Sequence, residues 1–363
     1  MKTRALLFLL LCLAVLASAC GGQTTTAGGA EPAATEQPPA DTEATEAAPE
    51  GGPDSLVVYS GRGEDLVAPL FEQFTADTGI DVEVKYADSA ELALLIAEEG
   101  DRSPADVFFA QSPGSVGFLA EQGALSEIDD AVLDRVDEQY RSDAGVWVGI
   151  TGRQRVLVYN SDEVEESDLP DSVKDLTDEQ YKGKVAVAPD NGSFQDFITA
   201  FRATEGDDAA RQWLEGMAAN ESPNYPKNSA IVEAVGRGEV PMGLVNHYYN
   251  EQALAEDPSL PSRNHRFADG DLGSLVLLTT VSTLTSTDSP DEATAFVEYL
   301  LSDKGQRYFA DEAFEYPLVE GVAAPENLPP LDEVGGPEYD FDDYGQGLQE
   351  TFEMISDSGI QTP

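Results

Sequence analysis

The chain has 363 residues and a formal net charge of −49, which argues against nucleic acid and anionic lipid as partners, because both carry negative charge. The acidic residues are spread along the whole chain, so the charge indicates a solvated acidic surface and is no evidence for a metal site. The sequence has only two histidines and no nucleophile elbow, histidine-containing zinc motif or phosphate-binding loop. We therefore expect a protein that is not an enzyme.

The first twenty residues have the features of a secretory signal. Lys2 and Arg4 precede the apolar run Leu6 to Leu16, which is too short to span a membrane. The small residues 17–19 then lead to Cys20, and this ending resembles a bacterial lipoprotein signal. The resemblance implies that residues 1–19 are removed and that Cys20 is acylated, which would anchor the protein to the outer face of the cell membrane. An ordinary secretory signal with an incidental cysteine is the alternative.

The segment after Cys20 has the composition of a tether. Residues 21–53 contain no aliphatic side chain larger than alanine and are rich in Thr, Ala, Pro, Glu and Gly. Such a segment cannot bury enough apolar surface to fold, so we expect residues 20–53 to be a lipidated cysteine followed by a disordered tether. About 310 residues remain for the folded body, which is too many for one simple core and favours two lobes.

Strand and helix patterns alternate in the first part of the body. The apolar and periodic runs predict strands at 56–59, 80–84 and 106–110, and helices at 64–77, 88–100 and from 113 to about 123. This order predicts a parallel sheet with helices on both faces.

The second part of the body continues this alternation after a polar turn at 151–153. We expect strands at 155–160, 184–188, 242–245 and 273–284, and helices after residue 193 and at 208–218, 229–237, 291–301 and 345–357. The runs at 154–159 and 276–281 are rich in β-formers, and we expect them to cross between the two lobes, because ligand clefts commonly lie between domains. Residues 323–344 are acidic and rich in proline.

Two adjacent tyrosines, Tyr248 and Tyr249, follow the predicted strand 242–245. The end of a strand is where open α/β sheets bind their ligands. A phenol titrates near pH ~10 in water, but a trivalent cation can displace its proton and bind the phenolate, which is a hard oxygen donor suited to Fe³⁺. The alternative is that both are ordinary amphipathic tyrosines of the core or surface. We expect the neighbouring His247 to be structural, because its side chain should point away from Tyr248.

A second candidate site is the loop 189–193, which leads directly into a predicted helix. Its backbone N–H groups would lie at a helix N-terminus, where anions bind. Arg62 and Arg153 lie at predicted turns after strands and are candidates for charge-assisted contacts to the same anion. Surface or inter-lobe ion pairs are the alternative for both arginines.

Several short motifs resemble one family over about residues 55–330. They are Val58-Tyr59-Ser60-Gly61-Arg62, Pro104-Ala105-Asp106-Val107-Phe108, Gly152-Arg153-Gln154-Arg155-Val156, Gly238-Glu239-Val240-Pro241, Asn246-His247-Tyr248-Tyr249 and Glu315-Tyr316-Pro317-Leu318. In this order they resemble the ferric-ion-binding proteins of iron uptake, which are substrate-binding proteins of ABC transporters. The resemblance implies an α/β fold of the type II periplasmic binding protein class, with two lobes, each a mainly parallel sheet flanked by helices, and a ligand cleft between them.

The predicted lobe boundaries follow from this fold. We expect residues 54–155 and 279–330 to form the N-terminal lobe and residues 156–278 to form the C-terminal lobe. Residues 331–363 should be an acidic C-terminal segment and a helix that packs on the C-terminal lobe.

The resemblance assigns the metal ligands residue by residue. Tyr248 and Tyr249 match the tandem tyrosines that bind iron in the family. Gly63 stands where some members have a histidine ligand, and Phe194 where another subgroup has a third tyrosine. Gln111 stands in place of an acidic ligand. We keep Gln111 and Tyr59 as candidates for the metal or the cleft.

The family also binds a synergistic anion, phosphate or carbonate. The residues that match its anion site are Asn191, Gly192, Ser193, Asn228 and Asn246. The sequence therefore predicts a monomeric extracytoplasmic lipoprotein that binds Fe³⁺, free or chelated, with an anion and delivers it to an ABC permease. A binding protein of the same fold for another small solute, such as an inorganic anion, a polyamine or a thiamine-like molecule, is the alternative. Gly63 and Gln111 favour this alternative, and the tyrosine pair and the anion loop oppose it.

Overall fold

The computed structural model describes residues 55–337, 340–341 and 347–361. The predicted signal, Cys20 and the tether lie outside these residues, as do parts of the predicted acidic C-terminal segment. No helix in the described ranges combines the length and the apolar character that a membrane crossing requires.

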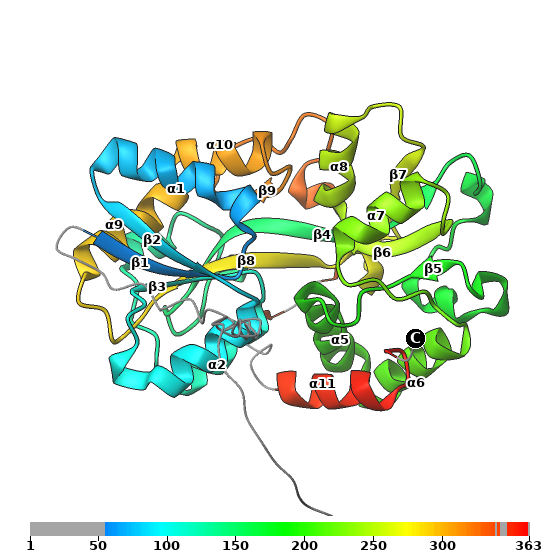
Figure 1. Cartoon of the computed structure of the whole chain (residues 1–363), viewed down its shortest axis with the longest axis horizontal. Helices are drawn as coiled ribbons and strands as arrows, with labels where there is room; N and C mark the ends of the chain where they lie inside the picture. Colours follow the sequence, from blue (N-terminus) through cyan, green and yellow to red (C-terminus); the bar gives the residue numbers. More distant parts are fainter. Residues whose placement is uncertain (1–54, 338–339, 342–346, 362–363) are drawn as a thin grey trace, which may run out of the picture. The chain divides into compact units, whose positions relative to one another are not determined.

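The strands of the described residues form one connected, mixed sheet (Figure 1). They are β1 Ser55–Ser60, β2 Asp81–Tyr86, β3 Val107–Ala110, β4 Val148–Asn160, β5 Val185–Ala186, β6 Met242–Asn246, β7 Ser262–His265, β8 Val276–Thr283 and β9 Tyr316–Pro317. Their hydrogen-bonded order is β2-β1-β3-β8-β4-β6-β5, and β7 and β9 also pair with β4.

The direction of the strands differs from the expectation of mainly parallel sheets. Parallel pairing joins β1 to β2 and β3, and β5 to β6. The strands β4 and β8 run antiparallel to every strand with which they pair. The expectation of mainly parallel sheets is therefore wrong. The long strands β4 and β8 run in the opposite direction to their neighbours, whereas a strand that follows a crossover helix would run parallel to the strand before it.

The thirteen-residue strand β4 is buried along its whole length and joins two groups of strands. Residues 148–154 pair with β8, whereas residues 155–160 pair with β6 and β7. We call β1, β2, β3, β8 and β9 with their packed helices the N-terminal lobe, and β5, β6 and β7 with theirs the C-terminal lobe. The predicted turn at 151–153 is wrong, because these polar residues continue the strand.

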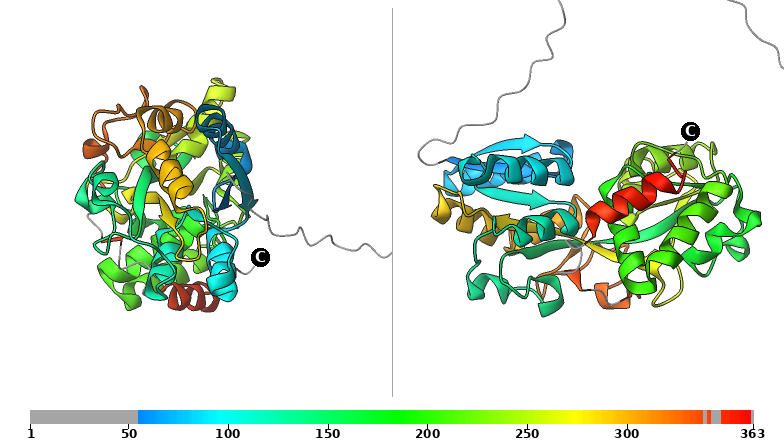
Figure 2. Two further views of the ribbon diagram at one scale, coloured as in Figure 1. Left: turned by 90° about the vertical axis from the view of Figure 1, so that its left-hand side faces the viewer. Right: turned by 90° about the horizontal axis from the view of Figure 1, so that it is seen from below.

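Helices cover both groups of strands (Figures 1 and 2). They are α1 Glu64–Thr78, α2 Ser89–Glu99, α3 Pro113–Glu121, α4 Asp130–Leu133, α5 Gly192–Glu205, α6 Asp207–Ala219, α7 Asn228–Gly236, α8 His247–Glu256, α9 Pro290–Leu300, α10 Asp303–Asp311 and α11 Leu348–Asp357. The sequence did not predict α4, α8 and α10. The C-terminal helix α11 packs on α5 and α6 and also contacts α3 of the N-terminal lobe.

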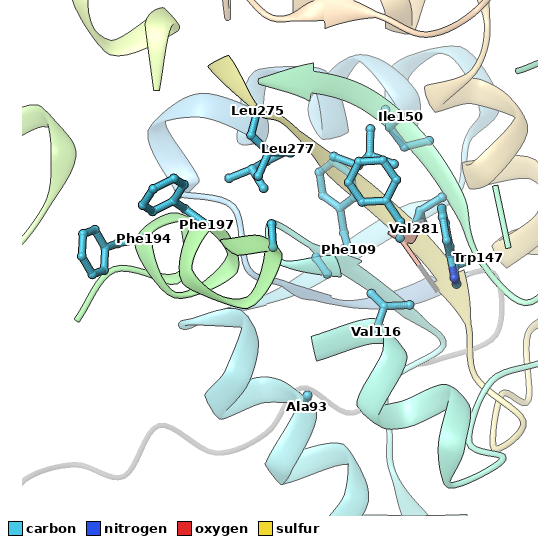
Figure 3. Close-up of a cluster of buried hydrophobic side chains, with 14 of the residues drawn as sticks. Ala93, Phe109, Val116, Trp147, Ile150, Phe194, Phe197, Leu275, Leu277 and Val281 are labelled. Atoms are coloured by element: carbon cyan, nitrogen blue, oxygen red, sulfur yellow. The ribbon is translucent and has the colours of Figure 1, made fainter. Parts of the chain in front are cut away.

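Aromatic side chains fill the core on both sides of β4 (Figure 3). In the C-terminal lobe, Phe194 and Phe197 of α5 lie against Trp213, with ring centroids 6.2 and 5.4 Å away. In the N-terminal lobe, Phe109 of β3 packs against Phe71 of α1. Burial of each of these rings contributes about 1.5–3 kcal/mol to the stability of the fold. This packing fixes the positions of α5 and β3, whose ends carry polar residues.

Candidate functional site

The tyrosine pair lies where the buried strand β6 passes directly into α8. Tyr248 is buried, with 2% of its surface exposed, and Tyr249 is half-buried. Their rings stack with centroids 4.1 Å apart and an angle of 29° between the planes. Two phenol groups are thus held together at the start of one helix.

The surroundings keep Tyr248 neutral at pH 7. Burial raises the pKa of its phenol well above 10, and a negative charge on Tyr249 would raise the pKa further. The guanidinium groups of Arg62 and Arg153 act in the opposite direction. A second phenolate is therefore unfavourable beside the first unless a cation lies between them.

A groove of about 910 Å³ lies between the helices α1 and α10 of the N-terminal lobe and α8 of the C-terminal lobe. Gln252 and Glu256 line it from α8, one and two turns after the tyrosine pair. Asp65, Asp311 and Glu312 line it from the N-terminal lobe. The helix α8, whose first turn carries the tyrosines, therefore forms one wall of an inter-lobe groove.

Three arginines lie buried beside the tyrosine pair. Arg62 follows β1, and its Cζ atom is 5.6 Å from the centroid of the Tyr248 ring. Arg153 and Arg155 are two residues apart in β4 and therefore lie on the same face of the strand. None of the three is more than 1% exposed.

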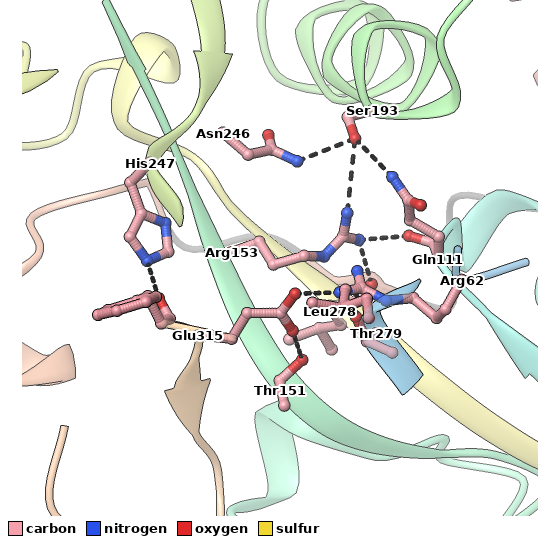
Figure 4. A network of polar contacts seen from close by, with 12 residues as sticks. Arg62, Gln111, Thr151, Arg153, Ser193, Asn246, His247, Leu278, Thr279 and Glu315 are labelled. Atoms are coloured by element: carbon pink, nitrogen blue, oxygen red, sulfur yellow. Dashed lines mark hydrogen bonds and ion pairs between the residues drawn. The ribbon is translucent and has the colours of Figure 1, made fainter. Parts of the chain in front are cut away.

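Figure 4 shows the hydrogen-bond and ion-pair partners of Arg62 and Arg153, of which Glu315 is the one carboxylate among the described residues. Arg62 forms an ion pair with Glu315, whose other oxygen accepts a hydrogen bond from Thr151. Arg153 donates to the Leu278 carbonyl over 2.8 Å and also to the Gln111 carbonyl. Arg62–Glu315 is the one ion pair of these arginines within the described ranges.

Arg155 has fewer partners than the other two. One of its nitrogens donates to Asn246 Oδ1 over 3.2 Å, while its Nε and Nη2 atoms are buried without a partner in the described part of the chain. Burial, assisted by the positive charge of Arg153, lowers the pKa of Arg155 to about 9. Buried guanidinium N–H groups without acceptors favour the binding of an anion.

The N-terminus of α5 lies opposite these arginines. Asn191 caps the helix by accepting a hydrogen bond from the Ser193 N–H over 3.1 Å, and Asn228 Nδ2 donates to Asn191 Oδ1 over 3.2 Å. Ser193 Oγ accepts from Asn246 Nδ2 at 3.0 Å and from Gln111 Nε2 at 3.3 Å. The amides of Asn246 and Gln111 and the guanidinium of Arg153 thus converge on the Ser193 hydroxyl, at the start of α5 and between the lobes.

Residues 102–340 match the family described as bacterial extracellular solute-binding protein. The chain belongs to this family. It is 30% identical over 308 residues to an Fe(3+)-binding periplasmic protein of Serratia marcescens, covering 84% of this chain and 90% of the relative. It is 32% identical over 291 residues to the major ferric iron-binding protein of Neisseria meningitidis serogroup B, covering 78% and 86%.

A solved structure gives the same result for the fold of this solute-binding protein. The crystal structure of iron-bound HitA from Pseudomonas aeruginosa superposes with a TM-score of 0.81 at 34% identity, covering 85% of this chain and 100% of HitA. The family and the two-lobed α/β fold that the sequence motifs predict are thereby confirmed.

The structure of this solute-binding protein brings most of the predicted site residues together. Tyr248, Tyr249, Arg62, Arg153, Gln111 and the anion-loop residues Asn191, Gly192, Ser193, Asn228 and Asn246 lie around the region between α5, β4 and α8. Within the described ranges, no group of three or more histidine, cysteine, aspartate or glutamate side chains is placed to hold a metal ion. The tyrosine pair supplies the candidate donors.

Tyr59 is not part of this group. Its side chain is buried, and its hydroxyl donates to Glu99 of α2 over 3.1 Å, while burial and that carboxylate raise its pKa. Successive residues of a strand face opposite sides, and Tyr59 faces the helix α2. The structure places Gly63 on the surface and packs Phe194 in the core.

His247 has the structural role that the sequence predicts. Its Nδ1 accepts from the Gln154 N–H over 3.1 Å, and its Nε2 donates to the Phe314 carbonyl over 2.8 Å. Burial lowers the pKa of His247 to about 4, so the ring is neutral at pH 7. It therefore ties the start of α8 to β4 and to the segment before β9.

Four residues near the site were missed from the sequence: Arg155, Glu315, Ser112 and Asp196. Arg155 was missed because Arg153 was predicted in a turn, and only the observed strand β4 shows that the two arginines share a face. Glu315 belongs to a recognised motif but is 253 residues from its partner Arg62. Nothing in the local sequence reveals that such a pair forms.

Proposed function

We propose that this protein captures ferric iron outside the cytoplasm and delivers it to an ABC permease. The observation that carries the proposal is the stacked pair of Tyr248 and Tyr249, which lies beside three buried guanidinium groups. The two curated relatives are named for ferric iron, and the HitA structure is iron-bound, which supports this cargo.

Both phenols would bind the metal as phenolates and release their protons. Two phenolates neutralise only part of a trivalent charge, so further donors are needed. Gln111 offers only a neutral amide, and its Nε2 already donates to Ser193 over 3.3 Å. A bound anion would complete the coordination shell of the iron and would also neutralise positive charge of the buried arginines.

We propose phosphate or carbonate as this synergistic anion. Asn191, Gly192, Ser193, Asn228 and Asn246 would hold it from the C-terminal lobe, and Arg62 and Arg153 would supply positive charge. The support is the convergence of the Asn246 and Gln111 amides and the Arg153 guanidinium on Ser193 Oγ at the N-terminus of α5. Iron and anion would then enter together or as one chelate.

The anchorage is also a proposal. Cys20 would carry lipid and hold a monomeric body at the outer face of the cell membrane through the tether 21–53. In this arrangement the N-terminal lobe consists of 54–155 and 279–330, and the C-terminal lobe of 156–278. Replacement of Cys20 by alanine should release the protein from the membrane fraction, and retention in that fraction would mean that another anchor exists.

The visible spectrum tests the cargo directly. Tyrosinate–Fe³⁺ absorbs visible light, so the purified full chain should develop a band on titration with ferric citrate in the presence of phosphate. The variants Tyr248→Phe and Tyr249→Phe should lose this band, and the matched control Tyr59→Phe should keep it, because Tyr59 faces α2.

The same titration separates the alternatives. Unchanged iron binding in either Tyr248→Phe or Tyr249→Phe would show that the assigned ligands are wrong. If the wild-type protein binds no iron with or without an added anion, another small solute is the cargo.

A further inference from the structure

Asp196 places a carboxylate inside the contact between the two lobes. It lies in α5, three residues after Ser193, and its surface is fully buried. Its Oδ1 accepts a hydrogen bond of 2.6 Å from Ser112 Oγ, which belongs to the N-terminal lobe at the start of α3. Its Oδ2 is buried and has no hydrogen-bond partner in the described part of the chain.

The charged and polar groups that face this carboxylate come from three elements. Arg153 and Arg155 attract it from β4, Ser112 donates a hydrogen bond to it at the start of α3, where the Gly114 N–H also favours the ionised form, and Asp88 repels it from the start of α2. Burial outweighs the attractive contacts and raises the pKa of Asp196 to about 7. Arg153 and Arg155 have no ion pair within the described ranges, so Asp196 is a nearby negative charge available to them.

We propose that Asp196 is a proton-linked counterion of the anion site. Its ionised carboxylate balances Arg153 and Arg155 while the site holds no anion, and it takes up one proton from solvent when an anion binds. This inference rests on the anion site of the proposed function, and Asp196 acts there as a positioning residue through the two arginines.

The physical reason is that the Asp196 carboxylate and the bound anion are both negative and lie near the same two guanidinium groups, those of Arg153 and Arg155, in a buried environment. The second negative charge raises the pKa of the first, so an incoming anion favours the neutral form of Asp196. Below about pH 6 the carboxyl is already neutral and does not oppose the anion. Above pH 7 binding requires a proton, and by linkage the affinity falls by up to about tenfold per pH unit.

Calorimetry with sulfate tests this, because sulfate keeps its charge throughout the neutral pH range. Iron-free full-length protein is titrated at pH 6 and pH 8 in two buffers with different ionisation enthalpies, which gives the number of protons taken up. The wild type should take up few protons at pH 6 and approach one at pH 8, with binding weaker by up to about tenfold at pH 8.

Two variants isolate the role of the carboxylate. Asp196→Asn should bind sulfate with equal affinity at both pH values and without proton uptake. The control Asp207→Asn removes an exposed carboxylate that pairs with Arg202 at the start of α6, and it should behave as the wild type. Ser112→Ala leaves Asp196 in place but removes a hydrogen bond to its ionised form, so the affinity should begin to fall at a higher pH.

The outcomes separate this inference from the function on which it rests. Sulfate binding by the wild type without proton uptake at pH 8 overturns the role of Asp196 and leaves the anion site intact. Proton uptake that persists in Asp196→Asn also overturns the role of Asp196 and leaves the anion site intact. If neither sulfate nor phosphate binds, the anion site is wrong and the counterion role falls with it.

Discussion

Replacement of Glu315 by glutamine should expose the energetic role of the buried pair that Glu315 forms with Arg62. Both side chains are fully buried, and Glu315 also accepts a hydrogen bond from Thr151. Glutamine keeps the shape of the side chain but leaves Arg62 charged and buried without a counterion. Loss of one member of such a pair costs about 3–5 kcal/mol, and we expect the free energy of unfolding to fall by this amount.

Urea unfolding measures the loss, with the fluorescence of the buried Trp147 and Trp213 as the signal. The matched control is Asp77→Asn, which breaks an ion pair to Lys304 whose side chains are 43% and 49% exposed. This control should cost less than about 1 kcal/mol. A loss in Glu315→Gln no larger than in Asp77→Asn would refute the reasoning.

The buffer must contain neither phosphate nor sulfate, because either anion would partly replace the missing carboxylate beside Arg62. Addition of phosphate should therefore stabilise Glu315→Gln more than the wild type. Equal stabilisation of both proteins would mean that the bound anion does not interact with Arg62.

Three further predictions concern the ligands and the packing behind them. Gln111→Glu should bind iron more tightly and with less dependence on added phosphate, as measured by competition with a chelator, because it adds a charged donor. Because the pKa of Tyr248 lies well above 10, its phenol is protonated at pH 7 and must release a proton when iron binds. Iron affinity should therefore rise with pH, with a smaller slope in Tyr248→Phe. Gly243→Ala should cost about 1–3 kcal/mol in urea unfolding, because its Cβ would lie 2.2 Å from Ile231 Cγ2, whereas Gly63→Ala, with open space around the new Cβ, should change stability by less than about 0.5 kcal/mol.

The sequence predicted the elements that depend on local pattern. The helix α1 begins and ends within one residue of the predicted 64–77, because its apolar side chains recur at helical spacing and Gly79 ends it in the left-handed conformation. The helix α8 was missed because its first residues, from His247 to Asn250, show no apolar periodicity. The antiparallel pairing of β4 and β8 was missed because strand direction depends on distant partners.

The candidate site was predictable where chemistry can be read from residue type. The phenols of Tyr248 and Tyr249 and the loop before α5 follow from donor chemistry and helix-start geometry. The counterions of the arginines could not be predicted from the sequence, because the pairing of Arg62 with Glu315 and the burial of Asp196 exist only in the folded chain. Tyr59 was misplaced because sequence alternation does not say which face of a strand meets the cleft.

The position of β4 has a consequence for how the chain folds. Every strand that pairs with β4 comes later in the sequence, from β6 to β9. Until those residues are available for pairing, β4 presents unpaired edges, which are the parts of a chain that associate with other copies. Completion of the sheet therefore waits for distant segments and should be slow. We expect a chain that ends before Val276 to leave both β3 and β4 without their shared neighbour β8, and to aggregate instead of folding as an isolated lobe.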